Sequence, residues 1–174
     1  MLNAMLKTKE VLDGLKIPFW LDCGTLLKMY RDKKPDMTDC DMAVSEKDAH
    51  LLLGAVRVFL DNGFKFYNIW THPLKGMTEL TLCLGTNKID LFVKFEQGKW
   101  VYTISSCSGR HIVAKQPKKY LYPLTVMNIL DTEWTVPNDT EKYLEVYYGK
   151  NWRIPIDEWD WTKDAPCIDR RWKI

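Results

Sequence analysis

An alternation of acidic and apolar residues over Asp39–Val44 most constrains what this chain can fold into. The run reads Asp-Cys-Asp-Met-Ala-Val, which indicates a β-strand with a largely apolar character. Successive side chains of a strand point to opposite faces of the sheet, so Asp39 and Asp41 project to the same side. Two carboxylates on one face can bind a divalent cation such as Mg²⁺, although such a pair can also simply face solvent at a sheet edge.

A third acid, Asp90, interrupts another apolar segment, 88–95. If this segment is a strand, residues 89, 91 and 93 take one face and Asp90 takes the other. We expect a third carboxylate to join the first two if this strand lies beside the acidic strand. Three such groups can hold Mg²⁺ or Mn²⁺ on both sides of a transferring phosphoryl group.

Hydrophobic periodicity predicts an α/β (α+β) chain with a mixed β-sheet flanked by helices. Ser45 and Asp48 resemble a capping box at the start of the clearest helix. Asp139 or Asn138 precedes the last helix as its N-cap, and Gly149 follows it. The expected helices are 2–15, 25–30, 49–60 and 139–148, and the expected strands are 19–21, 39–44, 64–67, 79–84, 88–95, 100–104 and 111–114.

Length and composition favour one globular domain over residues 1–174, with residues 150–174 as a Trp- and Pro-rich C-terminal extension. The chain is 46% apolar and 28% charged. Its net charge of +2 comes from 25 basic and 23 acidic residues that are spread along the sequence. Because no basic block stands out, we expect no nucleic-acid partner.

The cysteines and the apolar segments bear on the compartment. Five cysteines without a CxxC pair argue against a disulfide framework and a zinc ribbon. Zinc at Cys83, Cys107 and His111 remains an alternative, but scattered residues of these types are more often packing residues. No signal peptide, and no apolar run of the ~18 residues that a transmembrane segment needs, is evident. These features predict a cytoplasmic protein, or one peripheral to a membrane.

The order of the motifs is typical of the nucleotidyltransferase fold. A Gly24-Thr25 turn opens a short helix, a polar loop follows, and then come the D-x-D strand, a helix and a strand with a central Asp. In that fold, the backbone N–H groups of the turn face a diphosphate or triphosphate, because a helix N-terminus favours anions. Gly24 can instead merely permit a tight turn. Arg31, two helical turns beyond Thr25, can clamp a phosphate with its planar guanidinium.

Two segments resemble the LicD/fukutin family of phosphotransferases, and the resemblance spans residues 15–156. The family pattern G-T-L-L-x-x-x-R, a proline-containing loop and D-x-D is similar to Gly24–Arg31, Pro35 and Asp39–Asp41. The family's closing pattern is similar to Val136-Pro137, Tyr143-Leu144, Tyr148-Gly149-Lys150-Asn151-Trp152 and Pro155. One departure is that Met37 and Thr38, rather than acids, precede D-x-D, which leaves the choice of donor open.

The resemblance implies a metal-dependent transferase that moves a phospho-alcohol, such as phosphocholine or ribitol phosphate, from a CDP-linked donor to the hydroxyl of a sugar or glycan acceptor. It implies Asp39, Asp41 and Asp90 as catalytic and metal-binding residues, with Mg²⁺ or Mn²⁺, and Gly24, Thr25 and Arg31 as residues that position the diphosphate. The general base is not identified. Two alternatives stay open: transfer of NMP from an NTP to a small molecule or protein, and a non-catalytic binding module with the same fold.

Overall fold

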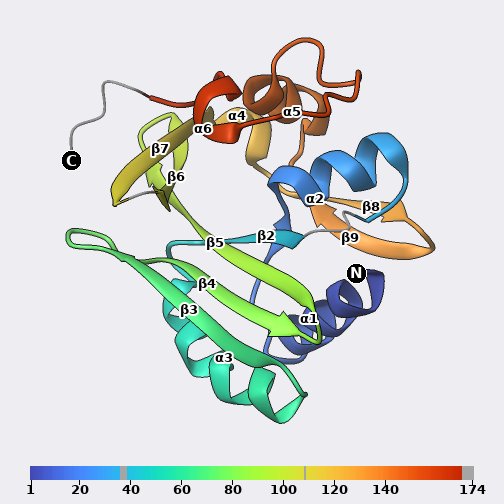
Figure 1. Cartoon of the computed structure of the whole chain (residues 1–174), viewed down its shortest axis with the longest axis vertical. Helices are drawn as coiled ribbons and strands as arrows, with labels where there is room; N and C mark the ends of the chain where they lie inside the picture. The colour runs from blue at the N-terminus through green and yellow to red at the C-terminus, as the bar shows by residue number, and fades with distance from the viewer. Residues whose placement is uncertain (36–38, 108, 170–174) are drawn as a thin grey trace.

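The structure, a computed structural model, describes residues 1–35, 39–107 and 109–169. Figure 1 shows a twisted sheet with helices on one face and at one end. In chain order the elements are α1 (Leu2–Gly14), β1 (Trp20–Leu21), α2 (Cys23–Leu27), the π-helical turn η1 (Lys28–Asp32), β2 (Asp39–Ser45), α3 (Ala49–Asp61), β3 (Lys65–His72), β4 (Gly76–Leu84), β5 (Asn87–Gln97), β6 (Trp100–Cys107), β7 (Arg110–Pro117), α4 (Lys118–Leu121), β8 (Thr125–Ile129), β9 (Thr132–Val136), α5 (Thr140–Tyr148) and α6 (Trp161–Asp164).

Among the residues that the structure describes, the main sheet is mixed and contains seven strands. Its order is β1-β2-β5-β4-β3, and β6 pairs with the end of β5 and with β7. β2 and β5 are parallel, whereas the other neighbours are antiparallel. Helices α1 and α3 contact each other and strands β5 and β3, while α4 and α5 contact β7 (Figure 1). The predicted mixed sheet with flanking helices is therefore confirmed.

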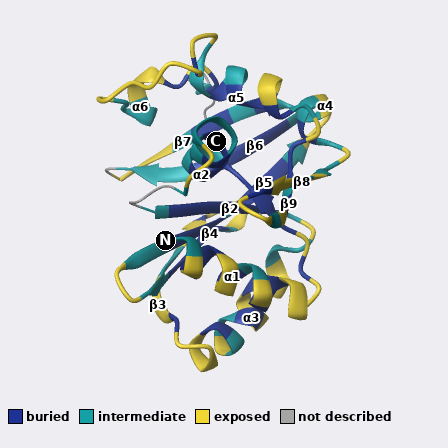
Figure 2. Ribbon diagram, turned by 90° about the vertical axis from the view of Figure 1, so that its right-hand side faces the viewer, coloured by how far each residue is buried: buried dark blue, intermediate teal, exposed yellow. Residues whose placement is uncertain are grey.

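Helix α3 shows how the apolar pattern builds the core. Leu52, Ala55 and Phe59 recur at helical spacing and are almost fully buried. The outward residues of α1 and α3 stay exposed, as the yellow surfaces in Figure 2 show, while the central strands are buried. Gly63 follows the helix with φ +86°, a left-handed conformation that glycine adopts without steric cost. The buried residues of α3 thus place its apolar face against the sheet.

Two local features differ from the sequence-based expectations. The capping box is wrong: Ser45 ends β2, and Asp48 is the N-cap of α3 without a side-chain cap hydrogen bond among the described residues. The second difference is the hairpin β8–β9, which the sequence analysis did not predict. Its turn residues Leu130 and Asp131 both have positive φ angles. Such turns usually carry Asn-Gly or Asp-Gly, and Leu130-Asp131 does not match that pattern.

The predicted caps of the last helix are confirmed. Asp139 caps α5, because its side chain accepts a hydrogen bond from the Lys142 N–H, and Gly149 follows the helix. The extension then contributes α6 and an antiparallel bridge between Ile168 and Ala114 of β7. Residues 36–38 of the polar loop and residues 170–174 of the extension, including Trp172, lie outside the described residues.

The sequence analysis predicted no segment that is long and apolar enough to cross a membrane. Within the described ranges, no helix combines the length and apolar character that crossing a bilayer requires. The cytoplasmic location itself stays a prediction.

Adjacent leucines of α3 test which face of the helix supports the fold. Leu52 is 0% exposed and Leu53 is 51% exposed. We expect Leu52→Ala to lower the free energy of unfolding by about 2–5 kcal/mol, because it leaves a cavity in the core. Leu53→Ala removes the same atoms from the surface and should change it by less than about 0.5 kcal/mol. Urea denaturation measures both values, and equal losses would contradict the packing described here.

Candidate active site

Three carboxylates meet at the parallel pair of central strands. β2 and β5 run in register with Asp41 opposite Asp90 and Asp39 opposite Lys88. Because paired residues share a face of the sheet, the acids of both strands point to the same side. One oxygen from each of Asp39, Asp41 and Asp90 lies within 4.8 Å of the others. The structure thus brings together the three acids singled out from the sequence.

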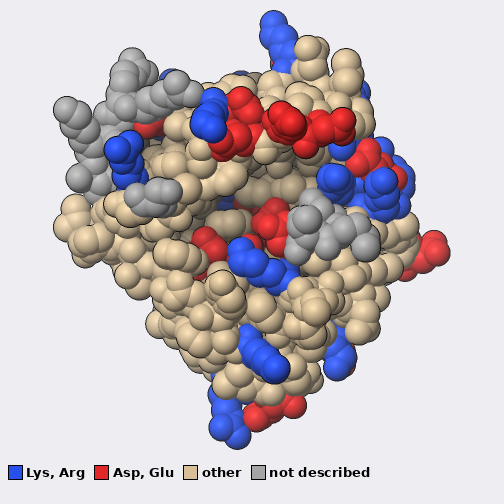
Figure 3. Space-filling model, in the orientation of Figure 1, with Lys and Arg blue, Asp and Glu red and all other residues tan. Residues whose placement is uncertain are grey.

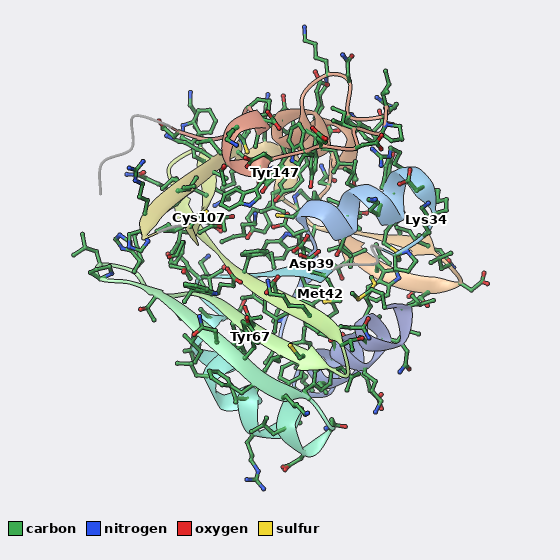
Figure 4. All side chains as sticks on the ribbon, viewed as in Figure 1. Lys34, Asp39, Met42, Tyr67, Cys107 and Tyr147 are labelled. Carbon is green, nitrogen blue, oxygen red and sulfur yellow. The ribbon has the colours of Figure 1, made fainter. Side chains whose placement is uncertain are left out.

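The three acids line a cavity of about 460 Å³. Figure 3 shows the hollow near the middle of the face seen in Figure 1, with acidic side chains gathered in it. Figure 4 shows Asp39 on β2 with Tyr147 of α5 on the opposite side of this space. The other lining residues come from the α2 turn, from strands β3 to β7 and from the C-terminal part: Cys23, Gly24, Trp70, Glu79, Lys88, Phe92, Thr103, Ser105, Ser106, Ala114, Tyr147, Tyr148, Trp159 and Trp161.

The electrostatics of the three acids suit a cation. Burial raises the pKa of Asp41 well above its usual range, and the neighbouring charges of Asp39 and Asp90 raise it further. Like charges held close together in a buried site are unfavourable unless an opposite charge compensates them. Clustered carboxylate oxygens are the ligands of hard divalent cations, so the residues present fit Mg²⁺ or Mn²⁺. No other group of His, Cys, Asp or Glu within the described residues has this spacing.

The turn at the start of α2 fixes Asp41. The backbone N–H groups of Gly24 and Thr25 donate to Asp41 Oδ2 at 2.8 and 3.4 Å. The Asp41 N–H donates in turn to Thr25 Oγ1 at 2.7 Å. Gly24 lines the cavity, as expected, but both N–H groups point at the protein's own carboxylate. The turn therefore orients one of the three clustered acids, and its contact with a diphosphate stays a prediction.

Arg31 lies beside a second cavity. Its guanidinium donates to both carboxylate oxygens of Asp32, at 2.7 and 2.9 Å, and to the Trp152 carbonyl at 3.0 Å. This second cavity, of about 480 Å³, shares Gly24, Tyr148 and other residues with the first. Arg31 thus connects η1 to the C-terminal extension, and the structure does not bring it into the wall of the carboxylate cavity. Its action on a diphosphate stays a prediction.

Polar residues that the sequence analysis did not select extend the site on β4 and β5. Thr81 lies opposite Asp90, and its Oγ1 is 2.9 Å from both Asp90 Oδ1 and Glu79 Oε1. Lys88 Nζ lies 2.7 Å from Asp90 Oδ2. Burial, followed by the charge of Asp90, raises the pKa of Glu79 to about 7. The alternation Glu79-Leu80-Thr81 in the sequence could have indicated that Glu79 and Thr81 lie on the same face of the sheet as the three acids.

A buried network behind the turn was also not predicted. Asp22 precedes α2 and is fully buried together with Lys94 of β5, whose Nζ lies 2.6 Å from Asp22 Oδ2. The Tyr143 hydroxyl of α5 donates to Asp22 Oδ1 at 2.8 Å. Burial opposes the charge of Lys94, but the Asp22 carboxylate outweighs it, so the pKa of Lys94 is raised. The network joins α5 to the strand that carries Asp90.

The three residues considered for a zinc site, Cys83, Cys107 and His111, do not lie together. Cys107 pairs with Arg110 at the tip of the β6–β7 hairpin, away from Asp39 in Figure 4. Cys83 lies near the end of β4, and the His111 ring packs edge-on against His72 with centroids 4.6 Å apart. Within the described residues they form no group with metal-binding spacing. The structure gives this zinc alternative no support.

Comparison with known proteins identifies the family. The family model described as LicD/FKTN/FKRP, nucleotidyltransferase domain, matches residues 16–139. The chain belongs to this family. It is 30% identical over 172 residues to the ribitol-5-phosphate transferases FKTN of Macaca fascicularis and Homo sapiens. Each alignment covers 91% of this chain and 34% of the relative, so this LicD-family chain spans about a third of the length of the curated relatives it matches.

A solved structure with the same architecture confirms the fold. The crystal structure of ANT(2″)-Ia in complex with adenylyl-2″-tobramycin superposes with a TM-score of 0.55 and covers 91% of the LicD-family chain and 80% of its own. The sequence identity is 12%, so the likeness shows the fold alone. The nucleotidyltransferase fold inferred from the order of the motifs is therefore confirmed.

The buried network makes a prediction about stability. Lys94→Met should lower the free energy of unfolding by about 3–5 kcal/mol, because it leaves the Asp22 carboxylate buried without its counter-charge. The double variant Asp22→Asn/Lys94→Met should lose less, since a neutral amide can still accept the Tyr143 hydrogen bond. Urea denaturation of the two variants compares the losses. A single variant as stable as the double variant would contradict the ion pair.

Proposed function

We propose that this domain is a metal-dependent transferase that moves a phospho-alcohol group from a CDP-linked donor to a sugar hydroxyl. The observation that carries the proposal is the convergence of Asp39, Asp41 and Asp90 in one cavity, which suits a divalent cation and a phosphorylated substrate. Membership of the LicD/FKTN/FKRP family supports it, as do the relatives named ribitol-5-phosphate transferases. Because the chain spans only part of these relatives, the activity is proposed for the domain.

The three carboxylates would hold the cation. It would supply positive charge at the diphosphate, where negative charge develops on the leaving nucleotide as its bond to the transferred phosphoryl group breaks. The α2 turn keeps Asp41 oriented through the N–H groups of Gly24 and Thr25. Lys88, half-exposed on the cavity wall, adds a cation beside Asp90. Arg31 would act on the diphosphate from the adjoining cavity.

Glu79 is the residue that we place as acceptor of the proton from the sugar hydroxyl. It lines the same cavity but is not part of the group of three acids that share an ion site. Its carboxylate approaches Asp90 through the shared Thr81 hydroxyl. A carboxylate beside the cation-binding group can contact a substrate hydroxyl without giving up a metal ligand, which is the position that general-base catalysis requires.

Metal binding is tested without substrate. We expect Mn²⁺ to raise the unfolding temperature of the wild-type protein, since a ligand at 100 times its Kd adds about 2.7 kcal/mol. Asp41→Asn should abolish this increase because it removes a central carboxylate. Asp61→Asn on α3, which changes an exposed acid far from the cluster in sequence, should leave the increase intact. If Mn²⁺ stabilises none of these proteins, the non-catalytic binding module is favoured.

Transfer is tested with CDP-choline and CDP-ribitol, a panel of sugar acceptors and Mg²⁺. We expect release of CMP that depends on both the acceptor and the metal. Absence of CMP across a broad donor panel would count against the proposal. Release of pyrophosphate from NTPs would instead support NMP transfer, the alternative on the same fold.

Glu79→Gln separates binding from proton transfer in the same assay. We expect kcat to fall by roughly 10²- to 10⁴-fold, the usual contribution of a positioned base, while the stabilisation by Mn²⁺ is kept. Glu133→Gln, an exposed acid on β9, is the matched control and should leave kcat unchanged. An unchanged kcat for Glu79→Gln would remove Glu79 from this role and leave the transferase proposal standing.

A further inference from the structure

Asp22 stands where a helix-capping side chain is expected, but it does not cap α2. It is the N-cap residue, with an extended backbone (φ −136°, ψ 172°), and within the described residues its side chain makes no capping hydrogen bond. An aspartate at this position normally accepts from the N–H group of the second or third helical residue. In α2 these residues are Gly24 and Thr25, whose N–H groups donate to Asp41 Oδ2 instead. Two carboxylates can therefore accept from the same pair of N–H groups.

Both oxygens of the Asp22 carboxylate are engaged by residues of other elements. Lys94 Nζ lies 2.6 Å from Asp22 Oδ2, and the Tyr143 hydroxyl donates to Asp22 Oδ1 at 2.8 Å. Asp22, Lys94 and Tyr143 are each at most 1% exposed, so solvent does not compete for these contacts. The backbone of Asp22 stays beside the acid cluster, because its N–H donates to the Asp41 carbonyl at 3.1 Å. The carboxylate is therefore close to the α2 turn but is directed toward β5 and α5.

The position of Lys94 links this pair to the acid cluster. Lys94 lies four residues beyond Asp90 on β5, so the two side chains take the same face of the strand. Helix α2 contacts both β2 and α5 (Figure 1). A buried ion pair adds little stability compared with apolar side chains of similar volume, and in some proteins it serves to select one arrangement of polar groups. At the α2 turn, the arrangement to be selected is which carboxylate accepts the two N–H groups.

We propose that Lys94 and Tyr143 are positioning residues for Asp41. By keeping the Asp22 carboxylate off the α2 turn, they leave the N–H groups of the turn to Asp41. Without its counter-charge, the Asp22 carboxylate would turn to the N–H groups that an N-cap aspartate normally accepts, and Asp41 would lose the contacts that orient it. The inference rests on the proposed function in one respect, which is that the acid cluster binds a cation.

Competition between two carboxylates predicts a rescue that simple loss of structure does not. We expect Lys94→Met to lower the affinity for Mn²⁺ about 10- to 100-fold in a calorimetric titration, the usual effect of losing a group that orients a metal ligand. Asp22→Ala/Lys94→Met also removes the competing carboxylate, so it should bind Mn²⁺ about as tightly as the wild type. If the wild type binds Mn²⁺ and the double variant binds it no better than Lys94→Met, the proposal is overturned.

The Gly24 amide reports the competition without any metal. The sequence contains a single Cys-Gly step, Cys23-Gly24, so labelling with ¹³C-carbonyl Cys and ¹⁵N-Gly assigns this amide directly. We expect its ¹H shift to change in Lys94→Met and to return to the wild-type value in Asp22→Ala/Lys94→Met. This pattern without Mn²⁺ binding by any variant would sink the proposed function alone. A wild-type Gly24 signal and wild-type Mn²⁺ affinity in Lys94→Met would sink the positioning role alone.

A milder pair of variants keeps the test valid if Lys94→Met folds poorly. Tyr143→Phe removes one hydrogen bond from Asp22 and keeps the ion pair, so no buried charge loses its partner. We expect its Mn²⁺ affinity to fall about three- to tenfold, the effect of one hydrogen bond. Tyr67→Phe removes a hydroxyl from a side chain of β3 that is 64% exposed, and should bind Mn²⁺ as the wild type does. Equal affinities and an unchanged Gly24 signal in both phenylalanine variants would overturn the proposal.

Discussion

The parallel pairing of β2 with β5 is the interaction on which the site depends. In this register Asp41 lies opposite Asp90. The other face of the same two strands carries Cys40, Ile89 and Leu91, each 0% exposed. A slip by one residue would move these apolar side chains to the cavity side and the acids into the core. The burial of apolar surface on one face therefore fixes the meeting of the carboxylates on the other.

Buried acids work against folding, and the structure compensates each of them differently. Asp41 accepts two backbone N–H groups, Asp90 lies beside Lys88, and Asp22 pairs with Lys94. These contacts orient the carboxylates, but the pKa of Asp41 remains raised by burial and by its acidic neighbours. A cluster that stays unfavourable without a cation is consistent with a site built for ligand binding rather than for stability.

The hydrophobic periodicity of the sequence and the order of its motifs were enough to predict the central strands and the fold. They also predicted that the acids lie on one face of the sheet. Partners distant in sequence were not predictable in this way: Tyr143 meets Asp22 only because α5 packs beside the α2 turn. Arg31 shows a second limit. Its spacing from Thr25 predicted a phosphate contact, which stays a prediction, but it did not reveal that the guanidinium pairs with the adjacent Asp32. A pattern can place a residue near a site, but it does not reveal which neighbour competes for it.

The three acids of the cavity and the aromatic side chains opposite them come from different parts of the chain. The acids lie on strands inside the segment that matches the family model, residues 16–139. Tyr147, Tyr148 and Trp159 come from beyond it, and the extension has little regular structure apart from α6. Charge chemistry on a phosphoryl group demands fixed geometry, which paired strands supply. Recognition of one alcohol or sugar among many depends on surface shape, which a connecting segment can change without disturbing the core. Under the proposed function, this division of the cavity would separate the groups that act on the reacting phosphoryl group from the groups that select the substrate.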